Sequence, residues 1–530
     1  MPRKIGGAKV VCAFAGIASV SAGLGAAEIV AQLFFQNASP IFSTGSLVID
    51  LAPPWLKELV IGWFGTGDKV VILVAVCFCA LVLASIAGIL EHSRPPWGRV
   101  LIGLVGAFTS FAALTRSNAT VLVVVPSLIA VTVALVLLSY LLRRIAKFEP
   151  SATPGPSAAT GPSATTGQSE SNEEVIARRS FLISATLATG LGILATVGSQ
   201  VAGASVRTAE AIRRAFQLPI ASKRVAPLAT GTSLEVAGIS PIITPNSSFY
   251  RIDTALIVPS IDPANWSLKV HGMVEEEVTL SFDELLALPL EESYTTLACV
   301  SNYVGGELIG NAKWLGYPIR KLIEQARPKP EADMVLSRSI DGFTASTPLA
   351  ALTDDRNAIL AVAMNEKPLP AEHGFPVRMV VPGLYGYVSA TKWITELKLT
   401  RFNAETAFWT TRGWSEKGPV KLSSRIDTPK DSQKLNQGTI PIAGVAWAQH
   451  TGISQVEVRI DGGEWMQTQL SDAISIDTWR QWVFYWDAVS GDHKITVRAI
   501  DSNGKLQVEK PSDVAPDGAT GLHSVFVNVA

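Results

Sequence analysis

Four long apolar runs near the start of this 530-residue chain constrain its fold more than any other feature. They cover residues 10–35, 70–90, 100–114 and 121–142. About 20 apolar residues span a bilayer as a helix, because lipid offers the backbone no hydrogen-bond partners. Buried helices of a soluble domain are the alternative, but such helices seldom stay apolar over so many successive runs. We therefore predict an all-α, four-helix transmembrane bundle over residues 1–148.

The lysine and arginine residues that flank these runs indicate how the bundle is oriented. Cytoplasmic loops of membrane proteins carry an excess of both residue types. One predicted side of the bundle carries Arg3, Lys4, Lys9, Arg94, Arg99, Arg143, Arg144 and Lys147, whereas the other carries Lys57, Lys69 and Arg116. Both ends of the bundle are therefore predicted to lie in the cytoplasm.

Two polar features of the bundle bear on electron transfer. A haem b between helices needs axial ligands, usually histidines. Of the six histidines in the chain, only His92 lies in this region, in a predicted loop, which excludes a bis-histidine membrane haem. Glu28 is an acidic residue inside the first run, and such residues are functional candidates by default. Because Glu28 lies near the outer end together with Gln32, we expect an interfacial position for it.

A polar linker and a further apolar segment follow the bundle. Residues 149–177 are rich in Ser, Ala, Thr, Pro and Gly without a hydrophobic period, which is typical of a flexible linker. Residues 178–204 begin with Arg-Arg-Ser-Phe-Leu and continue into a mildly apolar stretch, which resembles a twin-arginine export signal. An ordinary fifth membrane helix is the alternative. Both interpretations place the chain after residue 205 outside the cytoplasmic membrane, and an Ala-x-Ala-like site near Ala202 leaves cleavage open.

The remaining chain has the pattern of two globular domains. Over residues 205–419 we predict an α+β domain, with a capping box of Ser281 and Glu284 opening a helix, and with a turn followed by a helix over residues 314–325. Residues 420–530 contain short alternating strands and two hairpin signals, Asp-Gly-Gly and Asn-Gly. Strands at intervals of about 8–12 residues predict an immunoglobulin-like β-sandwich.

The exported part contains a single cysteine, Cys299. The other three, Cys12, Cys77 and Cys79, lie in the membrane runs. A lone cysteine in an oxidising compartment has no internal disulfide partner there. It is therefore either a small buried apolar residue or a reactive or metal-binding thiolate.

The segment around Cys299 favours the second interpretation. Residues 295–302 read Thr-Thr-Leu-Ala-Cys-Val-Ser-Asn, which resembles the Thr-Leu-x-Cys-x-(Gly/Ser)-Asn segment of the sulfite oxidase family of molybdenum enzymes. The resemblance covers about residues 230–530, and it implies a sulfite-oxidase-type molybdopterin domain followed by the family's dimerisation-type sandwich. Other matching segments lie in family order at 249–253, 309–316, 341–349, 363–370, 373–378 and 392–393.

The resemblance implies Mo-molybdopterin as the cofactor and Cys299 as the protein ligand of the metal. Soft sulfur ligands suit such a metal, and coordination removes the thiol proton. Arg251 is expected to face the substrate oxyanion, with a surface ion pair to Asp253 as the alternative. Arg378 lies between apolar neighbours, which favours a buried anion partner over a solvated position. The implied cofactor-binding residues are Tyr250, Arg251, Ile252, Asp253, Cys299, His373, Arg378, Ala390, Thr391 and Lys392.

Departures from the family pattern leave the substrate open. Trp414 stands near the place of a tyrosine found in true sulfite oxidases, and no Cys-x-x-Cys-His haem motif is present. The substrate is therefore expected to be sulfite or a similar oxyanion, an S-oxide or an N-oxide. Arg480, in a Trp-Arg-x-Trp segment, is expected either to pack against aromatic rings or to reach that substrate.

These expectations describe an enzyme in a bacterial cell membrane that exchanges electrons with an external carrier or a quinone. A homodimer is implied by the resemblance, whereas the formal net charge of −1 gives no indication of a nucleic-acid partner. A non-catalytic, membrane-anchored surface or adhesion protein with a decayed cofactor site is the alternative.

Overall fold

The computed structural model describes residues 4–34, 38–53, 67–116, 119–146 and 204–530, together with isolated positions within 56–64 and 186–192. The predicted linker, the twin-arginine-like motif, Ala202, Arg3, Lys57 and Lys147 lie outside the described residues. The chain forms two compact units, which consist of residues 1–204 with 255–257 and of residues 205–254 with 258–530.

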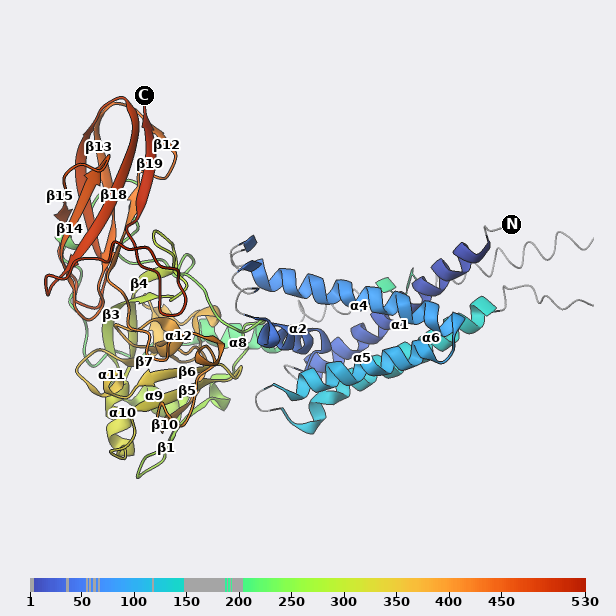
Figure 1. Ribbon diagram of the computed structural model, residues 1–530. Helices are drawn as coiled ribbons and strands as arrows, with labels where there is room; N and C mark the ends of the chain where they lie inside the picture. The colour runs from blue at the N-terminus through green and yellow to red at the C-terminus, as the bar shows by residue number, and fades with distance from the viewer. Residues whose placement is uncertain are drawn as a thin grey trace, which may run out of the picture. The chain divides into compact units, whose positions relative to one another are not determined.

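The first unit is all-α, as its apolar runs predict (Figure 1). Among the described residues, four helical segments are long and apolar enough to cross a membrane, namely Lys9–Phe34, Lys69–Ser93, Trp97–Leu114 and Val121–Ile145. A shorter apolar helix, α2, lies between the first two and was not anticipated from the sequence. The elements are α1 (Lys4–Phe34), α2 (Pro40–Leu51), α4 (Asp68–Ser93), α5 (Trp97–Leu114), the 3₁₀ turn η2 (Val121–Val124) and α6 (Val125–Ala146).

Small residues bring these helices together. A Cβ atom added at Gly16 of α1 would lie 2.0 Å from the carbonyl oxygen of Ala84 in α4. A Cβ atom at Gly88 would meet the carbonyl oxygen of Cys12 at the same distance. Lipid is as apolar as a leucine side chain, so helices in a membrane associate through such close backbone packing.

Glu28 is enclosed by the helices of the bundle. Its side chain has no exposed surface and accepts a hydrogen bond from the hydroxyl of Ser39. Ser39 is the N-cap residue of α2. The short helix α2, which the sequence analysis missed, therefore supplies the partner of this carboxyl group.

Residues 267–400 of the second unit contain two β-sheets, one mixed and one antiparallel. One has the strand order β2-β1-β10-β5-β6, and the other has the order β3-β4-β7-β8 with β9 paired to β7. Trp314 lies within strand β4, so the predicted turn at this position is wrong and the helix begins only at Ile319. The strands are β1 (Ser267–Gly272), β2 (Val278–Ser281), β3 (Glu291–Ala298), β4 (Ile309–Pro318), β5 (Met334–Ser339), β6 (Thr344–Pro348), β7 (Ile359–Met364), β8 (Lys367–Pro368), β9 (Arg378–Val380) and β10 (Ile394–Thr400).

Short helices connect these strands. The capping box is formed, because the Ser281 hydroxyl accepts from the Glu284 N–H and the Glu284 carboxylate accepts from the Ser281 N–H. The helices are α8 (Ala204–Ala215), α9 (Phe282–Ala287), α10 (Ile319–Ala326), α11 (Ala350–Thr353) and α12 (Gly386–Ser389), with 3₁₀ turns η3 (Thr230–Thr232), η4 (Pro263–Asn265), η5 (Ala371–His373) and η6 (Thr410–Arg412).

The C-terminal part is a two-sheet β-sandwich, as predicted (Figure 1). Its sheets have the orders β11-β13-β17-β16 and β12-β19-β18-β14-β15. Alternate residues of both sheets, such as Ile442, Trp482, Val456 and Val497, fill the core between them. The strands are β11 (Ser423–Thr428), β12 (Gln433–Leu435), β13 (Gly438–Trp447), β14 (Ile453–Ile460), β15 (Met466–Gln467), β16 (Gln469–Leu470), β17 (Arg480–Ala488), β18 (Gly491–Asp501) and β19 (Ser524–Val529).

Candidate active site

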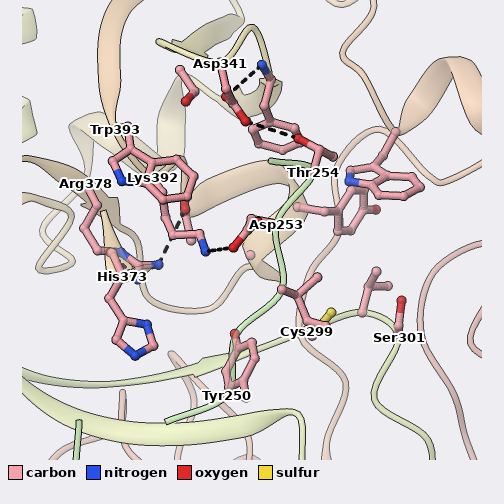
Figure 2. A pocket seen from close by; sticks show the side chains of 18 of the residues that line it. Tyr250, Asp253, Thr254, Cys299, Ser301, Asp341, His373, Arg378, Lys392 and Trp393 are labelled. Atoms are coloured by element: carbon pink, nitrogen blue, oxygen red, sulfur yellow. Dashed lines mark hydrogen bonds and ion pairs between the residues drawn. The ribbon is translucent and has the colours of Figure 1, made fainter. Parts of the chain in front are cut away.

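One pocket of the second unit gathers most of the predicted site residues (Figure 2). His373, Arg378 and Lys392 lie on one side of it, and Cys299 lies on another (Figure 2). The predicted residues that line the pocket are Tyr250, Ile252, Asp253, Cys299, His373, Arg378, Ala390 and Lys392. Segments separated by more than a hundred residues thus meet at one place.

Cys299 occupies the turn that follows the edge strand β3. Its N–H donates to the carbonyl oxygen of Leu308 at 2.9 Å, and only 8% of the residue is exposed. Burial raises the pKa of the thiol, whereas hydrogen bonds from the Ser301 N–H, the Ser301 hydroxyl and the Val300 N–H act in the opposite direction. Several donors therefore converge on the sulfur, and they would stabilise a thiolate once a metal replaced the proton.

Arg378 is a buried cation without a carboxylate partner among the described residues. It is 5% exposed, and its guanidinium donates to the carbonyl oxygens of Met379 at 3.3 Å, His373 at 3.1 Å and Ala390 at 3.5 Å. It also lies 5.2 Å from the centre of the Trp314 ring. Burial lowers its pKa to about 10. An uncompensated buried charge is costly, so the site is prepared for an anion.

Lys392 and Arg251 share a single carboxylate. The Lys392 ammonium lies 2.7 Å from Asp253 Oδ2 and 3.0 Å from the Glu372 carbonyl oxygen, and Arg251 Nε lies 2.9 Å from the same Asp253 atom. Burial lowers the pKa of Lys392 to about 8, although Asp253 opposes this shift. Together with Arg378, these groups form a cluster of three cations around one carboxylate.

His373 completes this cluster as a neutral ring. Burial, followed by the nearby charges of Arg378 and Lys392, lowers its pKa to about 4. Its Nε2 lies 3.2 Å from the carbonyl oxygen of Asn246, so this nitrogen carries the proton and donates. Nδ1 is then the acceptor nitrogen at neutral pH.

The lowered pKa of His373 predicts an acid-sensitive stability of the cofactor-free protein. The unfolded ring takes up a proton near pH 6.5, whereas the folded ring does so only near pH 4. This contribution to stability is present above the unfolded pKa and falls by about 3 kcal/mol as the pH drops to the folded one. The thermal midpoint of His373→Gln should therefore fall less than that of the wild type between about pH 7 and about pH 4.5.

His493→Gln is the control, because a hydrogen bond to Asp461 shifts the pKa of this histidine upward. That variant should show at least the wild-type fall in midpoint. Equal falls in the wild type and in His373→Gln would contradict the assignment of a neutral, buried His373.

Three of the residues predicted for the site, Arg251, Thr391 and Arg480, are not among the described residues that line the pocket. Arg251 is paired with Asp253, and its side chain is 35% exposed. Thr391 is fully buried, and its hydroxyl lies 2.7 Å from that of Ser337. Arg480 donates to the carbonyl oxygens of Ser471 and Ile453 within the sandwich. The geometry therefore matches the ion-pair alternative for Arg251, whereas the contacts described for Arg480 are to backbone carbonyl groups of the sandwich.

An aromatic wall of the pocket was missed by sequence reasoning, apart from Trp414. Tyr387 and Trp414 have ring centres 6.0 Å apart, and Trp409 lies 6.3 Å from Trp414. Phe343 lines the same pocket. Aromatic residues far apart in the sequence carry no local signal of this kind, because only the fold brings residues 343 and 414 to one cavity.

The residues present fit a molybdopterin. Arg378 supplies an unbalanced buried positive charge for a phosphate, and Cys299 supplies a sulfur that already accepts hydrogen bonds. Ser339 adds a buried hydroxyl that lines the pocket and has no hydrogen-bond partner among the described residues. Such an orphaned group is satisfied when a polar ligand occupies the cavity.

Comparisons with known proteins agree with this geometry. A family model described as "Oxidoreductase molybdopterin binding domain" matches residues 255–409, and one described as "Bacterial Ig domain" matches residues 423–497. The mitochondrial sulfite oxidase of Drosophila melanogaster is 28% identical over 323 residues, which cover 50% of this chain and 55% of that protein. The chain thus spans little more than half the length of the first curated relatives it matches.

Two bacterial relatives match over more of their own length. The "Uncharacterized oxidoreductase YuiH" of Bacillus subtilis is 33% identical over 183 residues, which cover 34% of this chain and 87% of that protein. The catalytic subunit of the protein-methionine-sulfoxide reductase MsrP of Campylobacter jejuni is 27% identical over 213 residues, which cover 35% of this chain and 68% of that protein. These matches favour the enzyme over the adhesion alternative, and the chain belongs to the sulfite oxidase family of molybdopterin-dependent oxidoreductases.

Proposed function

We propose that this protein reduces a neutral S-oxide or N-oxide outside the cytoplasmic membrane, with electrons from an external carrier such as a quinol. The carrying observation is the aromatic wall of Phe343, Tyr387, Trp409 and Trp414. When bound, the molybdenum centre supplies two-electron oxygen-atom transfer. The substrate takes up two electrons and two protons, its oxygen leaves as water, and the carrier is oxidised.

The charges of the pocket favour a neutral substrate over sulfite. Its lining cations, Arg378 and Lys392, belong to the proposed cofactor side, and Arg251 is occupied by Asp253. Asp341 adds a carboxylate to the lining. Sulfite is an anion that would need a dedicated cation, whereas a sulfoxide or N-oxide presents a polar oxygen on an apolar body that aromatic rings can cover.

Each predicted residue has a role in this proposal. Cys299 ligates the metal, and Asp253 holds Lys392 in place while Arg251 balances the charge of Asp253. Tyr250 and Ile252 form part of the wall of the cofactor pocket. The phosphate-binding group consists of His373, Arg378 and Lys392 with backbone groups of Ala390 and Thr391.

The proposal also includes the organisation of the chain. Residues 1–148 would form the membrane anchor, 149–177 a linker and 178–204 a twin-arginine-like fifth span. Residues 205–419 would form the catalytic domain and residues 420–530 the immunoglobulin-like domain, through which a homodimer could form. The apolar helices and the distribution of flanking lysines and arginines support this arrangement.

A paired assay of the purified holoenzyme tests the substrate class. We expect reduced viologen dye to be oxidised by methionine sulfoxide, dimethyl sulfoxide or trimethylamine N-oxide. Trp414→Ala should lower kcat/KM for the preferred oxide by about 10- to 100-fold, because burial of an aromatic side chain against a ligand contributes about 1.5–3 kcal/mol.

Trp465→Ala is the matched control, because Trp465 lies in the sandwich under Arg459 and Arg498 and does not belong to the pocket lining. It should keep the wild-type kcat/KM. Efficient sulfite oxidation with ferricyanide, combined with no reduction of any oxide, would overturn the proposed direction and substrate class.

A further inference from the structure

We propose that the immunoglobulin-like sandwich positions the protein ligand of the molybdenum site, because it fixes the chain segment that carries Cys299. Cys299 is taken as the metal ligand, as in the proposed function, whereas no particular substrate is assumed. The sandwich would act by positioning the sulfur and would not touch the substrate.

The first contact lies three residues before Cys299, at Thr296 in strand β3. The Thr296 N–H donates to the carbonyl oxygen of Asp477 at 3.0 Å, and the Thr296 carbonyl accepts from Gln449 Nε2 at 3.0 Å. The Thr296 hydroxyl accepts from the Trp479 N–H at 2.8 Å. All three partners belong to the sandwich, so it covers the free edge of β3 and holds this residue through its backbone and its side chain.

The second contact lies seven residues after Cys299, where the loop returns to β4. The Gly306 carbonyl oxygen accepts from Arg425 Nη1 at 2.7 Å, and Arg425 is itself held by Asp427 at 2.7 Å. At Gly305, with φ of 80°, an added Cβ atom would lie 2.2 Å from Cδ2 of His523. The backbone therefore packs directly on that ring, and both ends of the turn with Cys299 are anchored in the sandwich.

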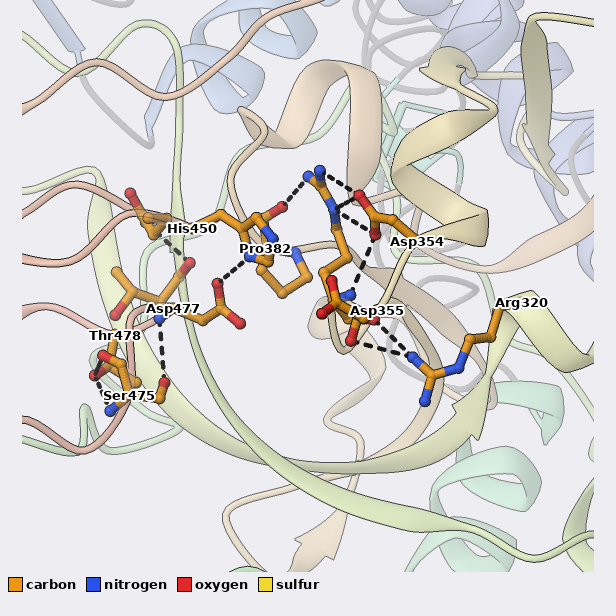
Figure 3. Close-up of polar contacts among 11 residues, drawn as sticks. Arg320, Asp354, Asp355, Pro382, His450, Ser475, Asp477 and Thr478 are labelled. Atoms are coloured by element: carbon orange, nitrogen blue, oxygen red, sulfur yellow. Dashed lines mark hydrogen bonds and ion pairs between the residues drawn. The ribbon is translucent and has the colours of Figure 1, made fainter. Parts of the chain in front are cut away.

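The same corner of the sandwich, which includes the His450 and Asp477 side chains drawn in Figure 3, contacts the segment that leads into helix α12. His450 Nδ1 lies 3.0 Å from Asp477 Oδ1, and an added Cβ atom at Gly383 would lie 3.1 Å from Cβ of His450. Gly383 precedes helix α12, which leads to Ala390 and Lys392. One set of sandwich residues therefore fixes the position of the thiol relative to the cofactor-binding segment.

Paired threonine variants of the full-length protein separate positioning from simple domain packing. Thr296→Val removes the hydroxyl that accepts from the Trp479 N–H and that also donates to Asn311 Oδ1 in β4, so Gln449→Leu, which removes a sandwich contact alone, is measured beside it. Thr295→Val is the matched control, because Thr295 is the adjacent residue, is fully buried and has a hydroxyl without a hydrogen-bond partner among the described residues. Both substitutions replace a threonine hydroxyl in the same strand by a methyl group. Of the two hydroxyls, only that of Thr296 has a described contact with the sandwich.

Two readouts report on the sulfur without any substrate. In the holoenzyme, Thr296→Val should shift or broaden the Mo(V) electron paramagnetic resonance signal, since the metal–sulfur geometry is no longer fixed. In the cofactor-free protein it should raise the rate of Cys299 alkylation by iodoacetamide, followed by peptide mass spectrometry, by about tenfold. Thr295→Val should match the wild type in both measurements.

A Thr296→Val protein that matches Thr295→Val in both readouts, even with a lowered thermal midpoint, would reduce these contacts to domain packing and overturn the proposal. If Thr296→Val does not fold, Gln449→Leu provides the test, because it removes only the bond to the Thr296 carbonyl and should raise alkylation about threefold. An unchanged rate in Gln449→Leu would likewise contradict positioning. A wrong substrate class would alter none of these outcomes.

Discussion

Cys299→Ser is expected to lower the rate of oxygen-atom transfer by more than about 100-fold. Groups that only support a metal ligand typically contribute about 10- to 100-fold to affinity or activity, so loss of the ligand itself should exceed that range. A serine hydroxyl is a harder ligand than a thiolate and deprotonates less readily, so it is a poor substitute for a soft sulfur donor. Turnover per bound molybdenum, together with the number of sulfur neighbours in X-ray absorption spectra, measures the effect.

Two further variants make this result specific. Ser301→Ala removes one hydroxyl donor to the sulfur but leaves the ligand, so a loss of about tenfold is expected. Cys79→Ser changes an exposed thiol on α4 and should leave turnover unchanged. Full molybdenum-dependent activity in Cys299→Ser would remove the assigned ligand and with it the proposed chemistry.

The membrane helices and the sandwich could be predicted because their signals are local. A run of apolar residues identifies a span by composition alone, and alternation with Asp-Gly or Asn-Gly turns identifies hairpins. The strand that contains Trp314 was not predicted, because that local signal is missing from it. Trp314 lies in a strand with nearly continuous burial, and such a strand lacks the alternation that would separate it from a turn and a helix start.

The cofactor-binding residues could be predicted only through the family resemblance. Nothing near Cys299 in the sequence indicates that residues 373, 378 and 392 converge on it, because β7, β9 and β10 bring them there through long-range pairing. The sequence alone could not decide whether Arg251 faces the substrate or pairs with Asp253. Asp253 lies two residues away, and only the structure places Lys392 on the same carboxylate.

Arg378→Met should separate stability from cofactor binding. In the cofactor-free protein the variant loses hydrogen bonds to carbonyl groups but also loses an uncompensated buried charge, so the two effects offset each other to within about 1–2 kcal/mol. With cofactor present it lacks a charge-assisted hydrogen bond to the phosphate, which contributes about 2–3 kcal/mol or roughly 30- to 160-fold in affinity. Molybdenum and pterin content of protein purified under identical conditions measures the second effect.

Arg425 provides the contrast, because it is equally buried but paired with Asp427 at 2.7 Å. Arg425→Met leaves that carboxylate buried without its partner, so it should destabilise the cofactor-free protein by about 3–5 kcal/mol. Inorganic phosphate should raise the thermal midpoint of the cofactor-free wild type but not that of Arg378→Met. Two outcomes would contradict this assignment: Arg378→Met could be as unstable as Arg425→Met, or it could keep its full pterin content. Either outcome would mean that the Arg378 cation stabilises the fold and does not bind an anion.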